Sequence, residues 1–187
     1  MNAATVRLFV AITMPEQVDC RTIALILARQ LPEFRISPIF HLTLVFIGSV
    51  DEIMLDSKSP LDLALQEVQQ AWLRKFTGLA LLAGGHIFGN TISLKLAEHE
   101  GLSTLEQALE KSLAKYQIAH DTGNAFVPHV ALGRISRQLR RTIAHDHAEL
   151  LAQLPAPAGG KNFAVDHFTL YQSLNGVYMS VRRYEMR

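Results

Sequence analysis

Apolar and polar positions alternate along this chain with two different periods, which predicts a mixture of strands and helices. Short runs rich in β-branched and aromatic residues predict strands at Arg7–Ile12, Thr77–Ala83, Thr91–Leu96, Phe163–Gln172 and Gly176–Arg183. Apolar residues at helical spacing predict helices at Pro15–Leu31, Leu61–Lys75, Leu102–Lys115 and Arg137–Leu151. This order of elements predicts an α+β fold made of two similar halves, each contributing an antiparallel sheet with flanking helices.

Turn and capping residues mark the boundaries of these elements. An Asn-Gly pair that begins at Asn175 predicts a hairpin between the last two strands. The glycine-rich residues 84–90 lie between two strands and lack the Gly-Lys-Ser/Thr of a phosphate-binding loop, so they favour a hairpin or loop. Pro15 predicts the start of the first helix, and Ser103 or Thr104 predicts a capping box at the start of the third.

One apolar strand begins with a histidine, and a similar strand follows in the second half of the chain. The first reads His41-Leu42-Thr43-Leu44-Val45-Phe46-Ile47-Gly48, and the second reads Pro128-His129-Val130-Ala131-Leu132-Gly133-Arg134. With a period of two, His41 and Thr43 share one face of the first strand. The repetition predicts two pseudo-symmetric lobes whose histidines face each other across an active-site groove.

The composition is that of a folded globular protein and narrows the setting in which it works. A length of 187 residues, with 49% hydrophobic and 19% charged residues, predicts one domain over residues 1–187. A net charge of +1 gives no global basic field, although a local basic cleft would suffice for an RNA end. Because Cys20 is the single cysteine and no signal peptide or membrane span is indicated, we expect a soluble cytoplasmic protein.

Two facing imidazoles can exchange protons with a substrate. A lone histidine in a strand is more often structural, but two in matching strands favour acid–base catalysis. One imidazole takes a proton from a nucleophile while the imidazolium protonates a leaving oxygen, which suits in-line displacement at phosphorus. Thr43 can donate to a phosphate oxygen, and Arg134 can supply a guanidinium fork. This chemistry requires no metal ligand set.

These motifs resemble those of the 2H phosphoesterases, specifically the bacterial 2′-5′ RNA ligase / RNA 2′,3′-cyclic phosphodiesterase family. The resemblance spans most of the chain, from an opening strand at Arg7–Ile12 through the two histidine strands to a closing hairpin. That hairpin contains Phe168-Thr169-Leu170-Tyr171-Gln172-Ser173 and Gly176-Val177-Tyr178.

The resemblance implies a role for five residues. It makes His41 and His129 the acid–base pair, Thr43 a phosphate contact and Arg134 a phosphate-binding arginine. Phe46 matches an aromatic residue near the nucleobase, but the period of two puts it on the face opposite His41. A bulge in the strand would be needed to bring it back, and plain core packing is the alternative interpretation.

The second motif departs from the family pattern at one position. Ala131 stands where the family has Thr or Ser, so the second strand offers no hydroxyl to the phosphate. Losing one neutral donor costs about 0.5–1.5 kcal/mol, and more if its partner is charged, which slows a reaction by about one or two powers of ten and need not abolish it.

The reaction that the resemblance implies is the opening of a 2′,3′-cyclic phosphate to a 2′-phosphate, with possible reversible 2′-5′ RNA ligation. The expected partner is RNA or a nucleotide with a 2′,3′-cyclic phosphate, bound by a monomer without cofactor, metal, ATP or membrane. Spacing does not distinguish base from acid, and we take His129 as base and His41 as acid. Two alternatives stay open: an RNA-end binding module with weakened catalysis, which Ala131 suggests, and a 2H phosphodiesterase acting on a small nucleotide metabolite.

Overall fold

A computed structural model of the chain describes residues 4–72, 75–123 and 125–186, and it confirms the α+β fold. Its main sheet has the strand order β10-β9-β1-β3-β7-β6-β5, with β2 paired to β7, and β4 and β8 form a separate pair. The strands are β1 (Thr5–Thr13), β2 (Arg35–Ile36), β3 (His41–Asp51), β4 (Phe76–Leu79), β5 (Leu81–Phe88), β6 (Thr91–Leu96), β7 (His129–Arg134), β8 (Phe163–Val165), β9 (His167–Leu174) and β10 (Val177–Glu185). All the registers between them are antiparallel.

The main sheet divides into two lobes between β3 and β7. In the described residues these two strands share one pair of opposite positions, Leu42 and Val130. One lobe is β10-β9-β1-β3 and the other is β7-β6-β5. The lobes are not the two halves of the sequence, because the C-terminal β9 pairs with the N-terminal β1.

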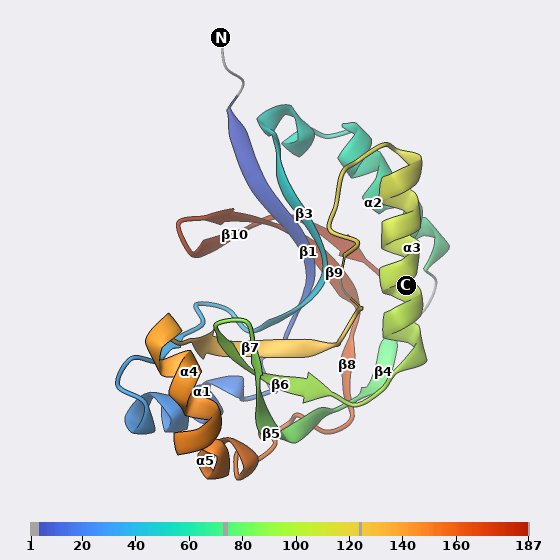
Figure 1. Ribbon diagram of the computed structural model, residues 1–187. Coiled ribbons are helices and arrows are strands. Elements are labelled where there is room, and N and C mark those ends of the chain that lie inside the picture. The colour runs from blue at the N-terminus through green and yellow to red at the C-terminus, as the bar shows by residue number, and fades with distance from the viewer. Residues whose placement is uncertain (1–3, 73–74, 124, 187) are drawn as a thin grey trace.

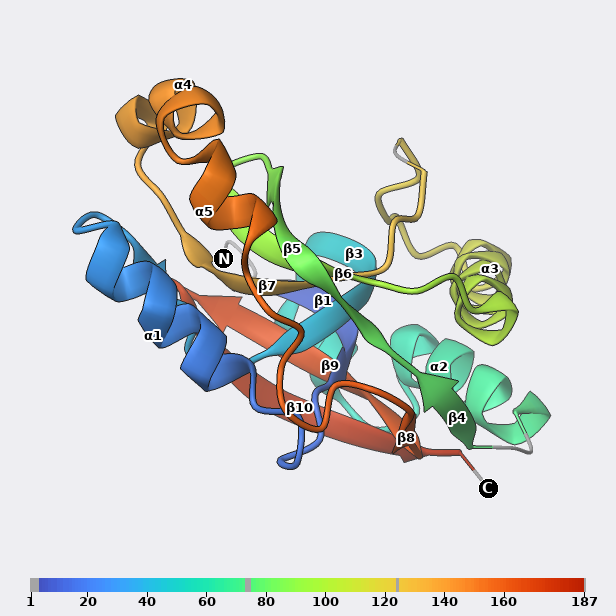
Figure 2. The same cartoon turned by 90° about the horizontal axis from the view of Figure 1, so that it is seen from below.

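Helices cover each lobe on the side away from the other (Figure 1). The helical segments are α1 (Cys20–Gln30), the 3-10 turn η1 (Glu52–Leu55), α2 (Pro60–Ala71), α3 (Glu100–Lys115), α4 (Arg137–Asp146) and α5 (Ala148–Ala152). The pair α2 and α3 contacts the first lobe through β10 and β3, whereas α1 and α5 contact β7 and β5 of the second. Figure 2 shows the same separation, with α2 and α3 on one side and α1, α4 and α5 on the other.

Apolar helix faces close the core as their spacing predicts. The predicted stripe of α3, Leu102, Leu105, Leu109 and Leu113, is fully buried. Because α3 contacts both α2 and β3, this stripe seals the first lobe on its outer face. None of the helices in the described residues has the length and apolar character that a membrane crossing requires.

Two helix starts differ from the prediction. The first helix begins at Cys20 and not at Pro15, because the Asp19 side chain accepts a hydrogen bond from the Thr22 backbone N–H at 3.0 Å and so caps it. The capping box predicted for α3 is absent: His99 precedes this helix without a side-chain cap, and the Thr104 hydroxyl donates to the Glu100 carbonyl instead.

Four further segments refine or confirm the predicted elements. The helix predicted over residues 137–151 divides at His147 into α4 and α5. The glycine-rich segment is mostly strand, since β5 runs to Phe88 before a turn leads into β6. The predicted hairpin at Asn175 is confirmed, whereas the helix predicted to reach Lys75 ends at Ala71, and residues 73–74 lie outside the described residues.

Candidate active site

A bulge in β3 returns Phe46 to the face that carries His41. The register between β1 and β3 skips Leu44 and, further along, Ile47, so two residues of β3 have no opposite residue on β1. The skip at Leu44 is the one that lies between His41 and Phe46. As a result the consecutive residues Leu44 and Val45 are both buried in the core. Phe46 is 51% exposed, and its ring lies 6.1 Å from that of Phe9 on the neighbouring strand. The bulge that the sequence required for Phe46 is therefore present.

β7 contains a bulge at the matching position. The register between β6 and β7 skips Leu132, three residues after His129, just as Leu44 lies three residues after His41. This bulge turns Arg134 back to the face of His129. Each lobe thus presents a histidine and, five residues later, a second side chain on the same face.

All five predicted site residues line one cavity of about 730 Å³ between the lobes. The structure brings together His41, Thr43, Phe46, His129 and Arg134, with Ala131 beside them. Other residues that line this cavity were not singled out from the sequence: Arg7, Phe9, Arg35, Phe88, Asn90, Thr91, Ser173, Asn175 and Tyr178. Most of them come from strands and turns remote in sequence from the two motifs, so a local pattern carried no signal for them.

Both histidines are held in the same tautomer by the same local contact. The Nδ1 atom of His41 lies 3.3 Å from the Ile39 carbonyl, and the Nδ1 atom of His129 lies 2.7 Å from the Val127 carbonyl. Because a carbonyl oxygen only accepts, Nδ1 carries the proton and donates in each ring. Nε2 is then the ring nitrogen that remains available for exchange with a substrate.

The surroundings of His41 keep its imidazole neutral. The residue is only 7% exposed, and the rings of Phe9, Tyr171 and Tyr178 lie within 6.2 Å of it, centroid to centroid. Burial lowers the pKa of His41 from 6.5 to about 4; the hydrogen bond to Ile39 opposes this effect, and the nearby His129 adds to it.

His129 has more open surroundings on the second lobe. Its ring is partly exposed and stacks on Phe88, with centroids 4.3 Å apart. The ammonium group of Lys95 lies 6.0 Å from the centroid of the same Phe88 ring. Phe88 therefore does for His129 what Phe9 does for His41: it supports one side of the imidazole.

Arg134 reaches across the groove to the first lobe. Its Nη2 donates to the Tyr178 hydroxyl at 3.1 Å. Figure 1 shows the β9–β10 hairpin, which carries Tyr178, extending to the same side of the molecule as the end of β7. Since the Tyr178 ring also lies 5.3 Å from that of His41, this contact brings the guanidinium of Arg134 toward the histidine pair. The sequence indicated Tyr178 only as part of the closing hairpin and predicted no role for it.

The cavity is lined by positively charged side chains. Arg7, Arg35 and Arg134 line it, and no Asp or Glu of the described residues does. In the same part of the chain, none of the three takes part in an ion pair. Such a cavity attracts an anion.

Ala131 faces a hydroxyl on the neighbouring strand. Ser93 of β6 is the residue opposite Ala131, and it is completely buried. Its Oγ has no hydrogen-bond partner among the described residues. In the first lobe the hydroxyl is on the histidine strand instead: Thr43 of β3 lies opposite Ala11 of β1.

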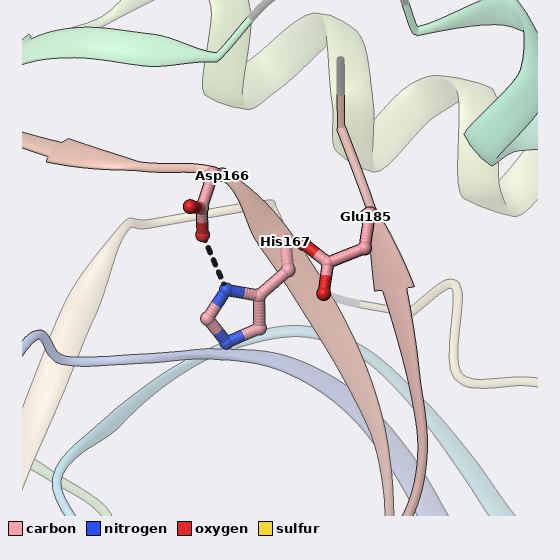
Figure 3. Close-up of side chains that lie close together, drawn as sticks. All are labelled: Asp166, His167 and Glu185. Atoms are coloured by element: carbon pink, nitrogen blue, oxygen red, sulfur yellow. Dashed lines mark hydrogen bonds and ion pairs between the residues drawn. The ribbon is translucent and has the colours of Figure 1, made fainter.

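A second polar cluster lies outside this groove, where β9 begins and β10 ends (Figure 3). It consists of Asp166, His167 and Glu185, beside a cavity of about 540 Å³. Asp166 accepts from His167 Nδ1 at 2.7 Å and lies 3.9 Å from Lys75 and 3.5 Å from Arg183. Glu185 pairs with Arg183 at 2.6 Å. The carboxylates are thus balanced by cations of the same chain, which describes an ion-pair network at the strand ends.

The chain matches a protein-family model and several solved structures. The model of the 2′-5′ RNA ligase superfamily matches residues 27–177. The fold is similar to E. coli LigT complexed with ATP, at 24% identity and a TM-score of 0.64, over 98% of this chain and 99% of that one. It is also similar to TT0787 of Thermus thermophilus, at 23% identity and a TM-score of 0.64, over 97% of this chain and 98% of that one.

Similarity at this level of identity shows a shared fold, whereas the family model covers both histidine motifs. No curated protein sequence matches this chain significantly. The matched residues include β3, β7 and nearly all the residues that line the groove. By this match the chain belongs to the 2′-5′ RNA ligase superfamily of 2H phosphoesterases.

Proposed function

We propose that this protein is an RNA 2′,3′-cyclic phosphodiesterase that opens 2′,3′-cyclic phosphate ends to 2′-phosphates. The observation that carries the proposal is the placement of two histidines, from matching bulged strands, in one groove. No Asp or Glu of the described residues lines this groove. Paired imidazoles and a hydroxyl donor beside arginines are what an in-line displacement at phosphorus requires. The family match supports a phosphoesterase in general and leaves the cyclic substrate as the proposal.

Proton roles in the proposed reaction follow from burial. A histidine with a pKa of about 4 is neutral in neutral solution, so His41 suits the base that takes a proton from water. The water oxygen then attacks phosphorus, the bond from phosphorus to the 3′-oxygen breaks, and His129 protonates that oxygen. This assignment reverses the one made from the sequence. Neither ATP nor a metal is required, because the two imidazoles carry both proton transfers.

Thr43 and Arg134 are proposed as the phosphate contacts. Thr43 lines the groove two residues after His41 and can donate to a non-bridging oxygen. Arg134 is oriented by Tyr178 and offers its remaining N–H donors to the phosphate, whose negative charge it offsets. Phe46, exposed at the edge of the groove, is proposed as the surface against which a nucleobase stacks.

Crystal complexes of a structural relative support nucleotide binding. E. coli LigT has been crystallised with ATP, with NADP+ and with 3′-AMP. These molecules share a nucleoside and phosphate with the substrate proposed for this chain. With an RNA 5′-hydroxyl in place of water as nucleophile, the same site would form a 2′-5′ linkage.

Incubation with 2′,3′-cyclic AMP tests the proposal directly. We expect conversion to adenosine 2′-phosphate, seen by chromatography against the 2′ and 3′ standards, with the same rate in EDTA. Formation of the 3′-phosphate, or loss of turnover in EDTA, would contradict the mechanism.

A second candidate, an RNA-end binding module, is favoured by the missing hydroxyl at Ala131. It predicts that RNA ending in a cyclic phosphate binds tightly and is recovered unchanged. The same incubation, extended to excess enzyme and long times, separates the two: accumulation of a 2′-phosphate contradicts the binding module.

A further inference from the structure

The groove carries more positive charge than a single cyclic phosphate needs. A 2′,3′-cyclic phosphate has one negative charge, and Arg134 together with a protonated imidazole already offsets it. Arg7 and Arg35 line the same cavity and remain outside any ion pair in the described residues. Two arginines on β10, by contrast, are paired: Arg182 with Asp62, and Arg183 with Glu185.

A specific backbone arrangement places Arg35 in the groove. It belongs to the two-residue strand β2, in which Arg35 lies opposite Arg134 and Ile36 opposite Gly133 of β7. The Ser37 N–H extends this contact by donating to the Leu132 carbonyl at 2.9 Å. Gly133 allows the approach, because a Cβ at this position would collide with the carbonyl of Arg35 and with the ring of a buried phenylalanine.

The result is two arginines side by side. Opposite residues of an antiparallel pair have Cβ atoms about 4.5–5.5 Å apart, and like charges at such positions repel each other. Since no carboxylate of the described residues lines the groove, these residues supply nothing there to relieve the repulsion. Anions bound to the two guanidinium groups would relieve it.

The two arginines divide the groove between them. Tyr178 draws Arg134 toward His41, where the reacting phosphate belongs. Arg35 lies on the adjacent strand, beside Arg134 and on the side of β7 away from Thr91. In an RNA ending in a cyclic phosphate, the phosphate nearest to the reacting one is that on the 5′-oxygen of the same nucleoside.

We infer that Arg35, beside Arg134, forms a second anion subsite, which binds the phosphate on the 5′-oxygen of the reacting nucleotide while Arg134 contacts the reacting phosphate. The inference rests on the proposed function for the identity of the reacting phosphate. It assigns the substrate class: nucleotides and RNA ends that carry a 5′ or internucleotide phosphate, in preference to plain 2′,3′-cyclic nucleosides.

Three substrates that differ by one phosphate test this subsite. They are 2′,3′-cyclic AMP, the same molecule with a 5′-phosphate, and the dinucleotide ApA ending in a 2′,3′-cyclic phosphate. For the wild-type protein at low salt we expect kcat/KM to be at least about tenfold higher for the second and third, since a hydrogen bond to a charged group adds enough binding energy for a tenfold effect. If both the 5′-phosphorylated nucleotide and the dinucleotide are preferred, the substrate class includes RNA ends as well as small nucleotides. If only the 5′-phosphorylated nucleotide is preferred, the substrate class is restricted to small nucleotides.

The variant Arg35→Gln tests whether Arg35 causes the preference for substrates with a phosphate on the 5′-oxygen. Gln keeps the backbone pairing of β2 and removes the charge, so the ratio of kcat/KM values should fall to about threefold or less. Arg21→Gln is the matched control, because Arg21 is an exposed arginine on α1 that does not line the groove, and it should keep the wild-type ratio. The preference should also shrink as salt is raised, since exposed charges are screened.

Binding of unreactive ligands makes the test independent of turnover. Adenosine 2′-phosphate and adenosine 2′,5′-bisphosphate are compared by titration calorimetry, and the wild type should bind the bisphosphate at least about tenfold more tightly. Equal affinities in the wild type, or an undiminished ratio in Arg35→Gln, would overturn the subsite. If the preference is present but no cyclic substrate is turned over, the subsite stands and the proposed function fails.

Discussion

The two lobes share one backbone design and surround their histidines differently. In each, a histidine begins a strand, a bulge follows three residues later, and the fifth residue after the histidine returns to the groove face. His41 lies buried among Phe9, Tyr171 and Tyr178, whereas His129 is partly exposed on Phe88. Symmetric placement thus brings both imidazoles to one groove, while unequal burial gives them the different surroundings on which the proposed base and acid roles depend.

The lobes also differ in where they keep a hydroxyl. In the first lobe Thr43 carries it and faces Ala11; in the second, Ser93 carries it and faces Ala131. Thr43 lines the groove, but Ser93 is buried and its Oγ unpartnered among the described residues. The second lobe thus retains a hydroxyl on the wrong strand for a phosphate to reach it directly.

Replacing either groove histidine should have the largest effect on the reaction rate, because each lobe supplies one of the two proposed proton-transfer groups. His41→Gln and His129→Gln should each lower kcat for 2′,3′-cyclic AMP by about 10²–10⁴-fold, because general acid and general base catalysis contribute that much. His145→Gln on the exposed surface of α4 is the control and should keep full activity. If one of the groove variants keeps more than about a tenth of the wild-type rate while folded, the histidines do not work as a pair.

The lowered pKa of His41 should appear as a pH-dependent loss of stability. The pKa of His41 is about 4 in the folded chain and about 6.5 in the unfolded chain. Above pH 6.5 both states hold a neutral imidazole, so protonation of His41 does not lower the free energy of unfolding there. As the pH falls from 6.5 to 4, only the unfolded chain gains this proton, and the free energy of unfolding should drop by roughly 3 kcal/mol more in the wild type than in His41→Gln.

Urea unfolding of both proteins from about pH 7.5 to about pH 3.5 measures this difference, since other titrating groups contribute to both curves. NMR titration of the His41 ring checks the pKa directly. Parallel curves for the two proteins, or a ring that titrates near its ordinary value of about 6.5, would remove the proposed distinction between base and acid.

Substitutions at the two matching groove positions, Thr43 and Ala131, should change kcat/KM by about tenfold in opposite directions. Thr43→Ala should lower kcat/KM for 2′,3′-cyclic AMP, and Ala131→Thr should raise it, because one donor to a phosphate oxygen is lost or gained. Ala131 lines the groove, so the added hydroxyl has a place to point. Thr43→Ser keeps the hydroxyl and should leave kcat/KM within about threefold; a loss of about tenfold in this variant would indicate that Thr43 acts through packing.

The smallest effect is expected from the buried hydroxyl. Ser93→Ala should raise the free energy of unfolding by about 1 kcal/mol, because it removes a buried polar group that has no partner among the described residues. Ser112→Ala is the matched control: this buried hydroxyl donates to the Ala64 carbonyl at 2.9 Å, so its loss should destabilise by a similar amount. A loss of stability in both variants would show that Ser93 has a partner.

Much of the fold was predictable because its signals are local. The Asn175 hairpin, the stripe of α3 and most strand and helix periods depend on residues close in sequence, and they are confirmed. The strands predicted at Thr77–Ala83 and Phe163–Gln172 were wrong in one respect, because each is divided in two, at Ala80 and at Asp166. Helix starts were less accurate: Asp19 caps α1 and His99 precedes α3, because a cap depends on one side chain that competes with neighbouring candidates.

The sequence by itself determined which residues we propose for the chemistry: two histidine strands, a hydroxyl in one and an arginine in the other. The same motifs indicated the family. Tertiary structure decided which faces they share, through bulges that a regular period of two does not predict. It also decided that C-terminal strands complete the N-terminal lobe, that burial separates the two histidines, and that Arg35 joins Arg134. The reason is physical: register, burial and charge balance are set by contacts between residues far apart in the chain, which a local pattern does not record.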